Sequence, residues 1–154
     1  MDDSTTGDTD RLLITRSISY AVAMLGISAA HNRSREIGCL SCISILDPGG
    51  HQIAFARMDG APFQSIGIAN RKAYSVAGNG MANHEFWNKI KDEPAIVSAS
   101  SQLDTGVWLG GGLPVVFDDV LVAAVAVSGR SNMEQDKIIA EAAIQAILAY
   151  LNRS

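Results

Sequence analysis

Residues 106–129 read GVWLGGGLPVVFDDVLVAAVAVSG and carry the strongest structural signal of the chain. Three consecutive glycines lead into a nearly uncharged apolar run, which a further glycine closes. Glycine is favoured where φ is positive, or where a ligand or a second strand needs the room that a Cβ atom would fill. Gly110, Gly111 and Gly112 therefore predict either one wall of a ligand pocket or a corner that turns one strand into the next.

The glycine tract matches neither of the common phosphate-binding motifs. GGGLP lacks the later glycine of a dinucleotide-binding fingerprint, and the chain contains no GK[ST] sequence of a P-loop. Pro114 and the β-branched residues after it indicate a strand rather than a phosphate-binding helix. We expect strands near 106–109, 114–117 and 120–127, and a tight turn at Asp118-Asp119 joins the last two.

The composition describes one domain. The chain has 154 residues, of which 47% are hydrophobic, and this length suits a single full core. Its net charge of −4 and its scattered basic residues give no footprint for nucleic acid. No uninterrupted apolar run is long enough to span a membrane, and the N-terminus is polar and acidic. We expect a disordered tail at 1–10, a single domain at 11–154 and a cytoplasmic location.

Apolar periodicity and turn residues divide the rest of the chain into helices and one hairpin. Helical spacing predicts helices over 11–32, 64–77, 83–91 and 135–151. The turn at 47–50, with the sequence DPGG, joins expected strands at 40–46 and 51–57. The serine-rich stretch at 98–102 is expected to be loosely organised. A possible capping box pairs Ser131 with Glu134.

The order of these elements indicates the fold class. Strands come in hairpins rather than alternating singly with helices, which favours α+β over α/β. The sequence therefore predicts an antiparallel sheet of about five strands that is covered by helices.

Cys39 and Cys42 have the C-x-x-C spacing of redox and metal sites. Strand alternation would place two residues three apart on opposite faces of a sheet. A closed zinc site would also need two distant ligands, because the chain has no second cysteine pair. We therefore interpret both residues as ordinary buried thiols and expect no metal site.

Three segments resemble the GlcG/HbpS family, which includes the C-terminal domain of PduO-type proteins. They are LDPGGHQIAFARMDGAP, ANRKAYSVA, and GGGLPVVFDDVLVAAVAVSGRSNMEQDKIIAEAAIQAIL. The resemblance extends over about residues 12–150. It implies an α+β domain with profilin-like layering, self-association into dimers or larger rings, and a pocket near the RMDGA loop, the following helix and GGGLP. Some relatives bind haem, so haem is the cofactor that the resemblance implies.

Three charged residues are candidates for contact with an anionic ligand. Arg57 and Asp59 are two apart at the end of a strand, so they form either a structural ion pair or a site where Arg57 meets a carboxylate. That carboxylate would belong to a substrate or to a haem propionate. Lys72, on the next helix, either adds a second positive charge or is a solvated surface lysine.

The three histidines carry different expectations. His31 lies near the end of the first helix, either as an imidazolium favoured by the helix dipole or as a haem ligand or acid/base group. His84 stands beside Phe86 and Trp87, which are either core aromatics at a helix start or stacking partners for a flat ligand. His51 follows a turn and is expected to be exposed.

Three functions fit these residues. The first is binding of haem or a related flat anionic ligand by Arg57 or Lys72 and a histidine, beside the glycine tract. The second is a cofactor-independent isomerase, lyase or hydrolase that acts on a small carboxylate or carbonyl compound. There the glycine amides would stabilise an oxyanion and His84, His31 or Asp59 would move a proton. The third is an accessory subunit that self-associates.

Overall fold

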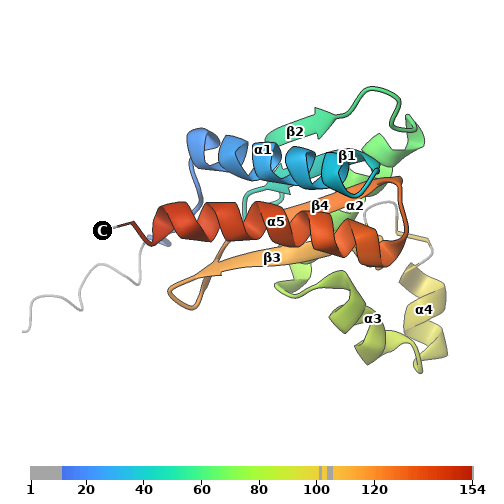
Figure 1. Ribbon diagram of the computed structural model, residues 1–154. Helices are drawn as coiled ribbons and strands as arrows, with labels where there is room; N and C mark the ends of the chain where they lie inside the picture. The colour runs from blue at the N-terminus through green and yellow to red at the C-terminus, as the bar shows by residue number, and fades with distance from the viewer. Residues whose placement is uncertain (1–11, 101, 104–105, 154) are drawn as a thin grey trace, which may run out of the picture.

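A four-stranded antiparallel sheet organises the computed structural model (Figure 1). The strands lie in the order β2-β1-β4-β3, so that β1 and β4 are central and β2 and β3 form the edges. Their bounds are Leu40–Leu46 for β1, Gln52–Arg57 for β2, Gly112–Phe117 for β3 and Val120–Arg130 for β4. The structure describes residues 12–100, 102–103 and 106–153, so the expected tail at 1–10 and the expected start of the first helix at Arg11 lie outside them.

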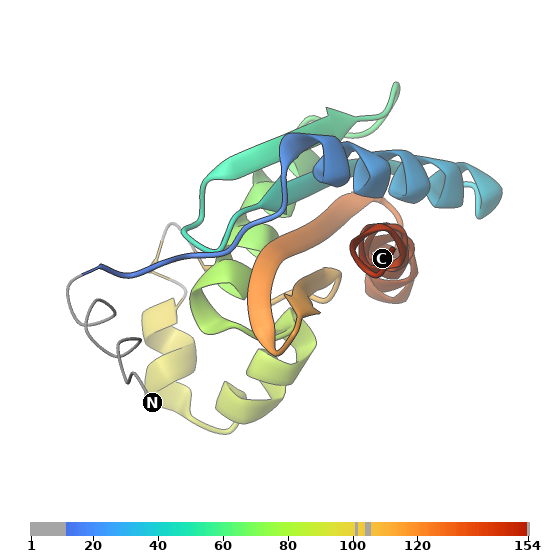
Figure 2. The same ribbon diagram turned by 90° about the vertical axis from the view of Figure 1, so that its left-hand side faces the viewer.

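Helices cover both faces of this sheet (Figures 1 and 2). The helices α1 (Tyr20–Glu36) and α5 (Met133–Leu151) pack together on one face, and α2 (Gln64–Asn79) covers the other. Two short helices, α3 (Asn83–Ile90) and α4 (Pro94–Ser100), follow α2 and lie beyond the β3 edge (Figure 1). The α+β class and the antiparallel sheet predicted from the sequence are confirmed.

Strand β4 shows why the apolar run near the C-terminus is continuous. All of its residues from Val122 to Ser128 are buried, because helices cover both faces of the sheet. Val125 and Val127 belong to the core beneath α1 and α5, whereas Ala124 and Ala126 belong to the core beneath α2. The small alanine side chains allow α2 to lie close to the sheet.

The hairpin between β3 and β4 turns as the sequence predicts. Asp118 has φ of 49° and Asp119 has φ of 60°. Positive φ at both central residues is the backbone of a two-residue hairpin turn whose twist matches that of the strands, and Asp tolerates this region better than most residues.

The sheet has four strands among the described residues rather than about five. The expected strand at 106–109 is wrong, because this segment pairs with no strand in the described part of the chain. Its Val107 N–H instead donates to the Ser75 hydroxyl of α2 at 2.9 Å. A side chain of α2 therefore satisfies a backbone donor that a neighbouring strand would otherwise bind.

The first helix begins later than its apolar periodicity predicts. It starts at Tyr20 because Ser19 is its N-cap, with a side-chain oxygen that accepts from the Val22 N–H at 3.3 Å. Residues 12–16 are exposed and carry no regular structure.

Two further boundaries differ from the predictions. The stretch expected to be loose is partly helical, since α4 runs through Ser100 from Pro94, a residue that suits the first helical position. The capping box of α5 lies one residue later than expected, between Asn132 and Gln135. No helix in the described residues is long and apolar enough to cross a membrane.

The close approach of β4 to β1 generates a stability prediction. A Cβ atom at Gly129 would overlap the Leu40 carbonyl oxygen and lie 2.8 Å from the Ser41 Cα atom, both in β1. We expect Gly129→Ala to lower the free energy of unfolding by about 1–3 kcal/mol, in the range of overpacked cores. Urea titration followed by circular dichroism measures this change.

Gly67→Ala provides the matched control. A Cβ atom at this position in α2 would have nothing within 4 Å. Alanine in a helix interior is favoured over glycine by roughly 0.5–1 kcal/mol, so this variant should be as stable as the parent or more stable. Equal destabilisation by both substitutions would contradict the assignment of Gly129 to a close strand contact.

Candidate functional site

A buried ion pair lies where the glycine tract meets the helices. The side chain of Lys72, on α2, is 2% exposed, and its Nζ atom donates to Asp136 Oδ2 at 2.8 Å and to the Val127 carbonyl at 2.9 Å. The Ser131 hydroxyl donates to the other carboxylate oxygen of Asp136. Lys72 is therefore not a solvated surface lysine. It joins α2, on one face of the sheet, to β4 and to α5, on the other face.

The glycine tract makes room for this ion pair. Gly111 has φ of 101°, and a Cβ atom there would lie 2.5 Å from the Asp136 Cβ and 3.3 Å from the Lys72 Nζ. A Cβ atom at Gly112 would lie 3.0 Å from Val76 Cγ2 and would overlap the Asn83 amide. Gly111 and Gly112 thus serve close packing at the start of β3.

Asn83 connects the same lysine to α3. This side chain is fully buried, and its Nδ2 donates to the Lys72 carbonyl at 3.1 Å. Its Oδ1 has no hydrogen-bond partner among the described residues. The first residue of α3 is therefore held against the middle of α2, which fixes the position of His84 next to it.

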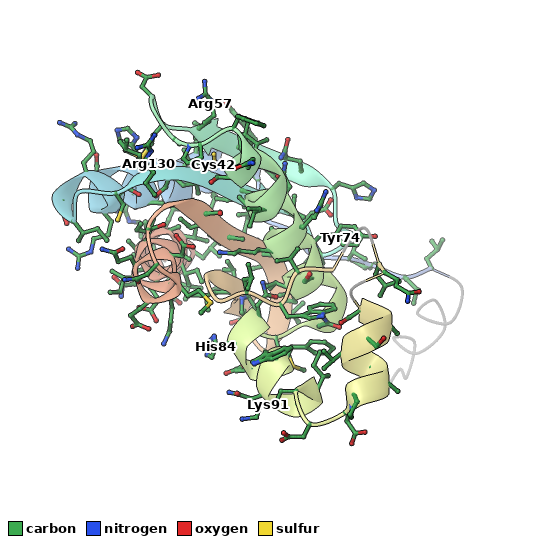
Figure 3. The ribbon with its side chains drawn as sticks, turned by 90° about the vertical axis from the view of Figure 1, so that its right-hand side faces the viewer. Cys42, Arg57, Tyr74, His84, Lys91 and Arg130 are labelled. Atoms are coloured by element: carbon green, nitrogen blue, oxygen red, sulfur yellow. The ribbon has the colours of Figure 1, made fainter. Side chains whose placement is uncertain are left out.

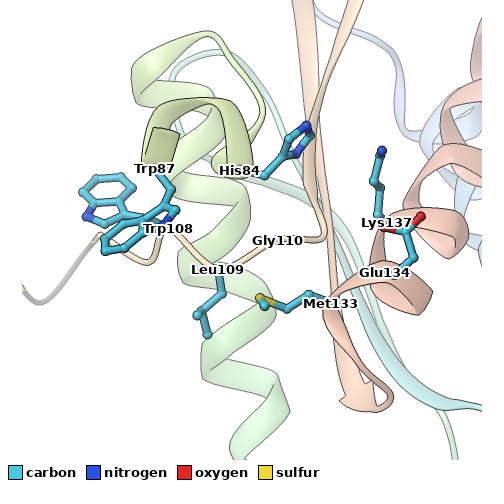
Figure 4. Close-up of a pocket in the computed structure, with 8 residues that line it drawn as sticks. All are labelled: His84, Trp87, Trp108, Leu109, Gly110, Met133, Glu134 and Lys137. Atoms are coloured by element: carbon cyan, nitrogen blue, oxygen red, sulfur yellow. The ribbon is translucent and has the colours of Figure 1, made fainter. Parts of the chain in front are cut away.

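Beside this network lies a pocket of about 540 Å³ (Figure 4). It is bounded by α3, by the segment that precedes β3 and by the first turn of α5. Both tryptophans of the chain line it. The complete lining is His84, Trp87, Trp108, Leu109, Gly110, Met133, Glu134 and Lys137.

The pocket has an apolar side and a polar side. In Figure 4 the two indole rings lie on one side, and the side chains of His84 and Lys137 extend on the other. Phe86 packs against Trp108, with ring centroids 4.6 Å apart. Such a pocket suits a ligand with a flat apolar body and a charged end.

Two polar atoms of the pocket residues are buried without a hydrogen bond. They are His84 Nδ1 and Trp108 Nε1, and neither has a partner among the residues that the structure describes. Buried polar nitrogens are normally paired, because leaving one unpaired costs roughly 1–3 kcal/mol. His84 thus offers an unused imidazole nitrogen.

Arg57 and Asp59, which the sequence grouped with the glycine tract, do not line the pocket described above. Arg57 ends β2, and the tract ends in Gly112, the first residue of β3, so they lie on opposite edge strands, about 14 Å apart at three strand spacings. Figure 3 shows Arg57 far from His84. Both charged residues are exposed, and no ion pair joins them within the described residues.

The remaining predicted residues are placed as follows. His31 is partly buried on α1 and does not line the pocket described above. His51 is exposed as expected, and its Nδ1 lies 3.2 Å from Asp47 Oδ1. Of the three tract glycines, Gly110 lines the pocket.

Sequence reasoning missed several lining residues. Trp108 stands two residues before the tract and could have been singled out by that proximity. Met133, Glu134 and Lys137 belong to a helix start that carries no motif for a pocket, and only the packing of α5 beside Gly110 brings them there.

The two cysteines are free and buried in this structure. Cys39 and Cys42 are free, are 3% and 0% exposed, and belong to different core clusters. Burial raises the pKa of both thiols, and the nearby Asp136 charge raises the pKa of Cys39 further. The nearby Arg57 charge opposes this rise at Cys42 but does not outweigh burial, and neither thiol is as accessible as a reactive cysteine.

The fold and the pocket define an α+β domain with one antiparallel sheet between helical layers and an amphiphilic pocket at the β3 edge. The family model described as haem degrading protein HbpS-like matches residues 18–145. The chain belongs to this HbpS-like family, and the resemblance noted in the sequence is confirmed. Protein GlcG of Escherichia coli strain K12 is a relative, 28% identical over 118 residues, 77% of this chain and 83% of that protein.

Two further relatives differ in how much of their length is matched. An uncharacterized 15.0 kDa protein in the dhaT-dhaS intergenic region of Citrobacter freundii is 30% identical over 129 residues, 83% of this chain and 90% of that protein. Corrinoid adenosyltransferase PduO of the same organism is 33% identical over 120 residues, 77% of this chain and 36% of PduO. The chain thus spans only about a third of PduO.

Two solved structures share the fold and more than a quarter of the sequence. Protein ORFY of Klebsiella pneumoniae superposes with a TM-score of 0.82 at 29% identity, over 90% of this chain and 96% of that one. A complex of PduOC with haem superposes with a TM-score of 0.77 at 27% identity, over 84% of this chain and 94% of that one.

The buried ion pair generates the second prediction. Lys72→Met leaves the Asp136 carboxylate buried without a cation, and Asp136→Asn leaves the Lys72 ammonium without an anion. We expect each to lower the free energy of unfolding by about 3–5 kcal/mol, as for broken buried pairs. The double variant should lose less stability than the sum of the two single variants, because it leaves no unpaired charge buried.

Urea titration measures these variants beside Lys89→Met, which removes an exposed lysine of α3. That control should change stability by no more than about 0.5 kcal/mol. Strict additivity of the two single variants would contradict a direct interaction.

The third prediction concerns the thiols. Iodoacetamide should alkylate neither cysteine in the native protein at neutral pH, because both are buried and their pKa values are raised. Mass spectrometry should show two labels once guanidinium chloride unfolds the chain, which has two cysteines. Rapid labelling of the native protein would contradict the burial of these residues.

Proposed function

We propose that this protein binds haem, or a related flat ligand with an anionic group, in the pocket between α3, the segment before β3 and α5. The observation that carries the proposal is a pocket that His84, whose Nδ1 has no hydrogen-bond partner among the described residues, lines together with two indole rings. The pocket volume of about 540 Å³ also falls within the range of small-ligand sites. The haem complex of a related chain, PduOC, supports the choice of ligand.

The residues present fit a haem group chemically. His84 can supply a neutral imidazole nitrogen, which is the protein ligand most often found on haem iron. Trp87 and Trp108 can cover the faces or edges of a macrocycle, since aromatic pairs favour offset and tilted contacts. Bound haem would supply an iron centre with redox and ligand-binding chemistry, and His84 would hold it through such a nitrogen.

Each pocket residue has a role that its own chemistry allows. The indole rings and Met133 exclude water from the apolar part of the ligand. His84 would hold the metal of a haem-like ligand, or would hydrogen-bond a polar group of a metal-free ligand. Gly110 leaves the wall free of a side chain, so the ligand can approach the main chain there.

Haemin titration tests this proposal. Added haemin should give a saturable change in its Soret absorption, and it should quench the intrinsic tryptophan fluorescence with the same dissociation constant. The two readouts should agree because both tryptophans line the pocket. No saturable Soret change at micromolar protein would overturn the proposal.

Histidine variants locate the ligand. We expect His84→Ala to weaken haemin binding about tenfold or more, equal to about 1.4 kcal/mol, and to alter the Soret spectrum of the bound form. His31→Ala and His51→Ala should bind as the parent does, since neither side chain lines the pocket. An unchanged spectrum in His84→Ala, with a change in His31→Ala, would move the site to α1.

A further inference from the structure

The polar side of the pocket contains one cation. Lys137 is the only lysine or arginine among the described residues that line the pocket. It lies on the first part of α5, and its side chain is 35% exposed. The same side of the pocket holds one anion, Glu134.

Lys137 has only a weak partner within the protein. Its Nζ lies 3.9 Å from Glu141 Oε1, and the Glu141 side chain is 46% exposed. Exposed pairs of this length contribute little stability, roughly 0–1 kcal/mol. A carboxylate brought into the pocket by a ligand can therefore replace Glu141 at small cost.

The backbone of Lys137 is held in place by its neighbour. Asp136 is clamped by Lys72 at 2.8 Å and by the Ser131 hydroxyl. The first turn of α5 is therefore fixed relative to α2 and β4. A cation on a fixed turn loses less conformational entropy on binding than one on a mobile loop.

We propose that Lys137 determines the specificity of this pocket by pairing with a carboxylate at the edge of a flat ligand. The negative charge of Glu134 repels the same carboxylate. This inference rests on the proposed function, because it assigns the anionic end of the same ligand. The anionic end of the ligand then lies near α5 rather than near Arg57, which is on the edge strand opposite β3. The ligand then lies with its apolar body against the tryptophans and its acid group toward α5.

The test compares the dissociation constants of two ligands for the parent and for variants of the two charged pocket residues. The probes are haemin and haemin dimethyl ester, in which both propionates are esterified and uncharged. The proteins are the parent, Lys137→Gln, Glu134→Gln and the control Arg57→Gln. Tryptophan quenching at low ionic strength gives the dissociation constants, and urea titration verifies that each variant is folded.

We expect the parent to bind haemin about tenfold more tightly than the ester, equal to about 1.4 kcal/mol. Lys137→Gln should weaken haemin binding by about the same factor and leave the ester unchanged. Glu134→Gln should strengthen haemin binding severalfold, since it removes a like charge. Arg57→Gln should leave both constants as they are.

The outcomes separate the two proposals. If the parent binds neither probe saturably, the proposed function fails, and this inference fails with it. If the parent binds both probes and Lys137→Gln weakens them equally, or weakens neither, the pocket stands and the role of Lys137 is refuted. If Arg57→Gln alone abolishes the preference for haemin, the anionic end lies at the β2 edge.

Discussion

The buried ion pair between Lys72 and Asp136 is the constraint on which the rest of the structure depends. A lysine and an aspartate removed from water must be paired and hydrogen-bonded, and here the Val127 carbonyl and the Ser131 hydroxyl complete the arrangement. The pair connects helices on opposite faces of the sheet, so it has to pass beside the start of β3. Gly111 is needed at that point because any side chain would collide with the pair.

Much of the fold was predictable because local rules determine it. The hairpin of β1 and β2 follows from a DPGG turn between two short apolar segments, and α2 follows from its apolar spacing. The prediction of a strand at 106–109 was wrong for a physical reason. Apolar residues indicate that a segment is buried, but strand pairing depends on which acceptors its backbone N–H groups reach. Val107 finds one in Ser75, thirty-two positions earlier in the chain, which no local pattern reveals.

The site was predictable only in part. Gly110 of the glycine tract lines a pocket, and so do His84 and its neighbour Trp87. Arg57 was grouped with the tract because the family resemblance implied a pocket near the RMDGA loop and GGGLP. Sequence periodicity does not give the order of the strands, which places Arg57 and the tract on opposite edges of the sheet. Lys137 carries no sequence motif, and only the packing of α5 brings it to the pocket.

The alternation of valine and alanine along β4 has a consequence for the pocket. Ala124 and Ala126 set how closely α2 lies on the sheet, and α2 carries Lys72. The length of a lysine side chain is fixed, so the depth of this alanine layer determines whether Lys72 can reach Asp136 on the far helix. Ala124 and Ala126 do not line the pocket, yet they act as a spacer between α2 and the sheet. The small side chains of a central strand thus help to set the shape of the pocket.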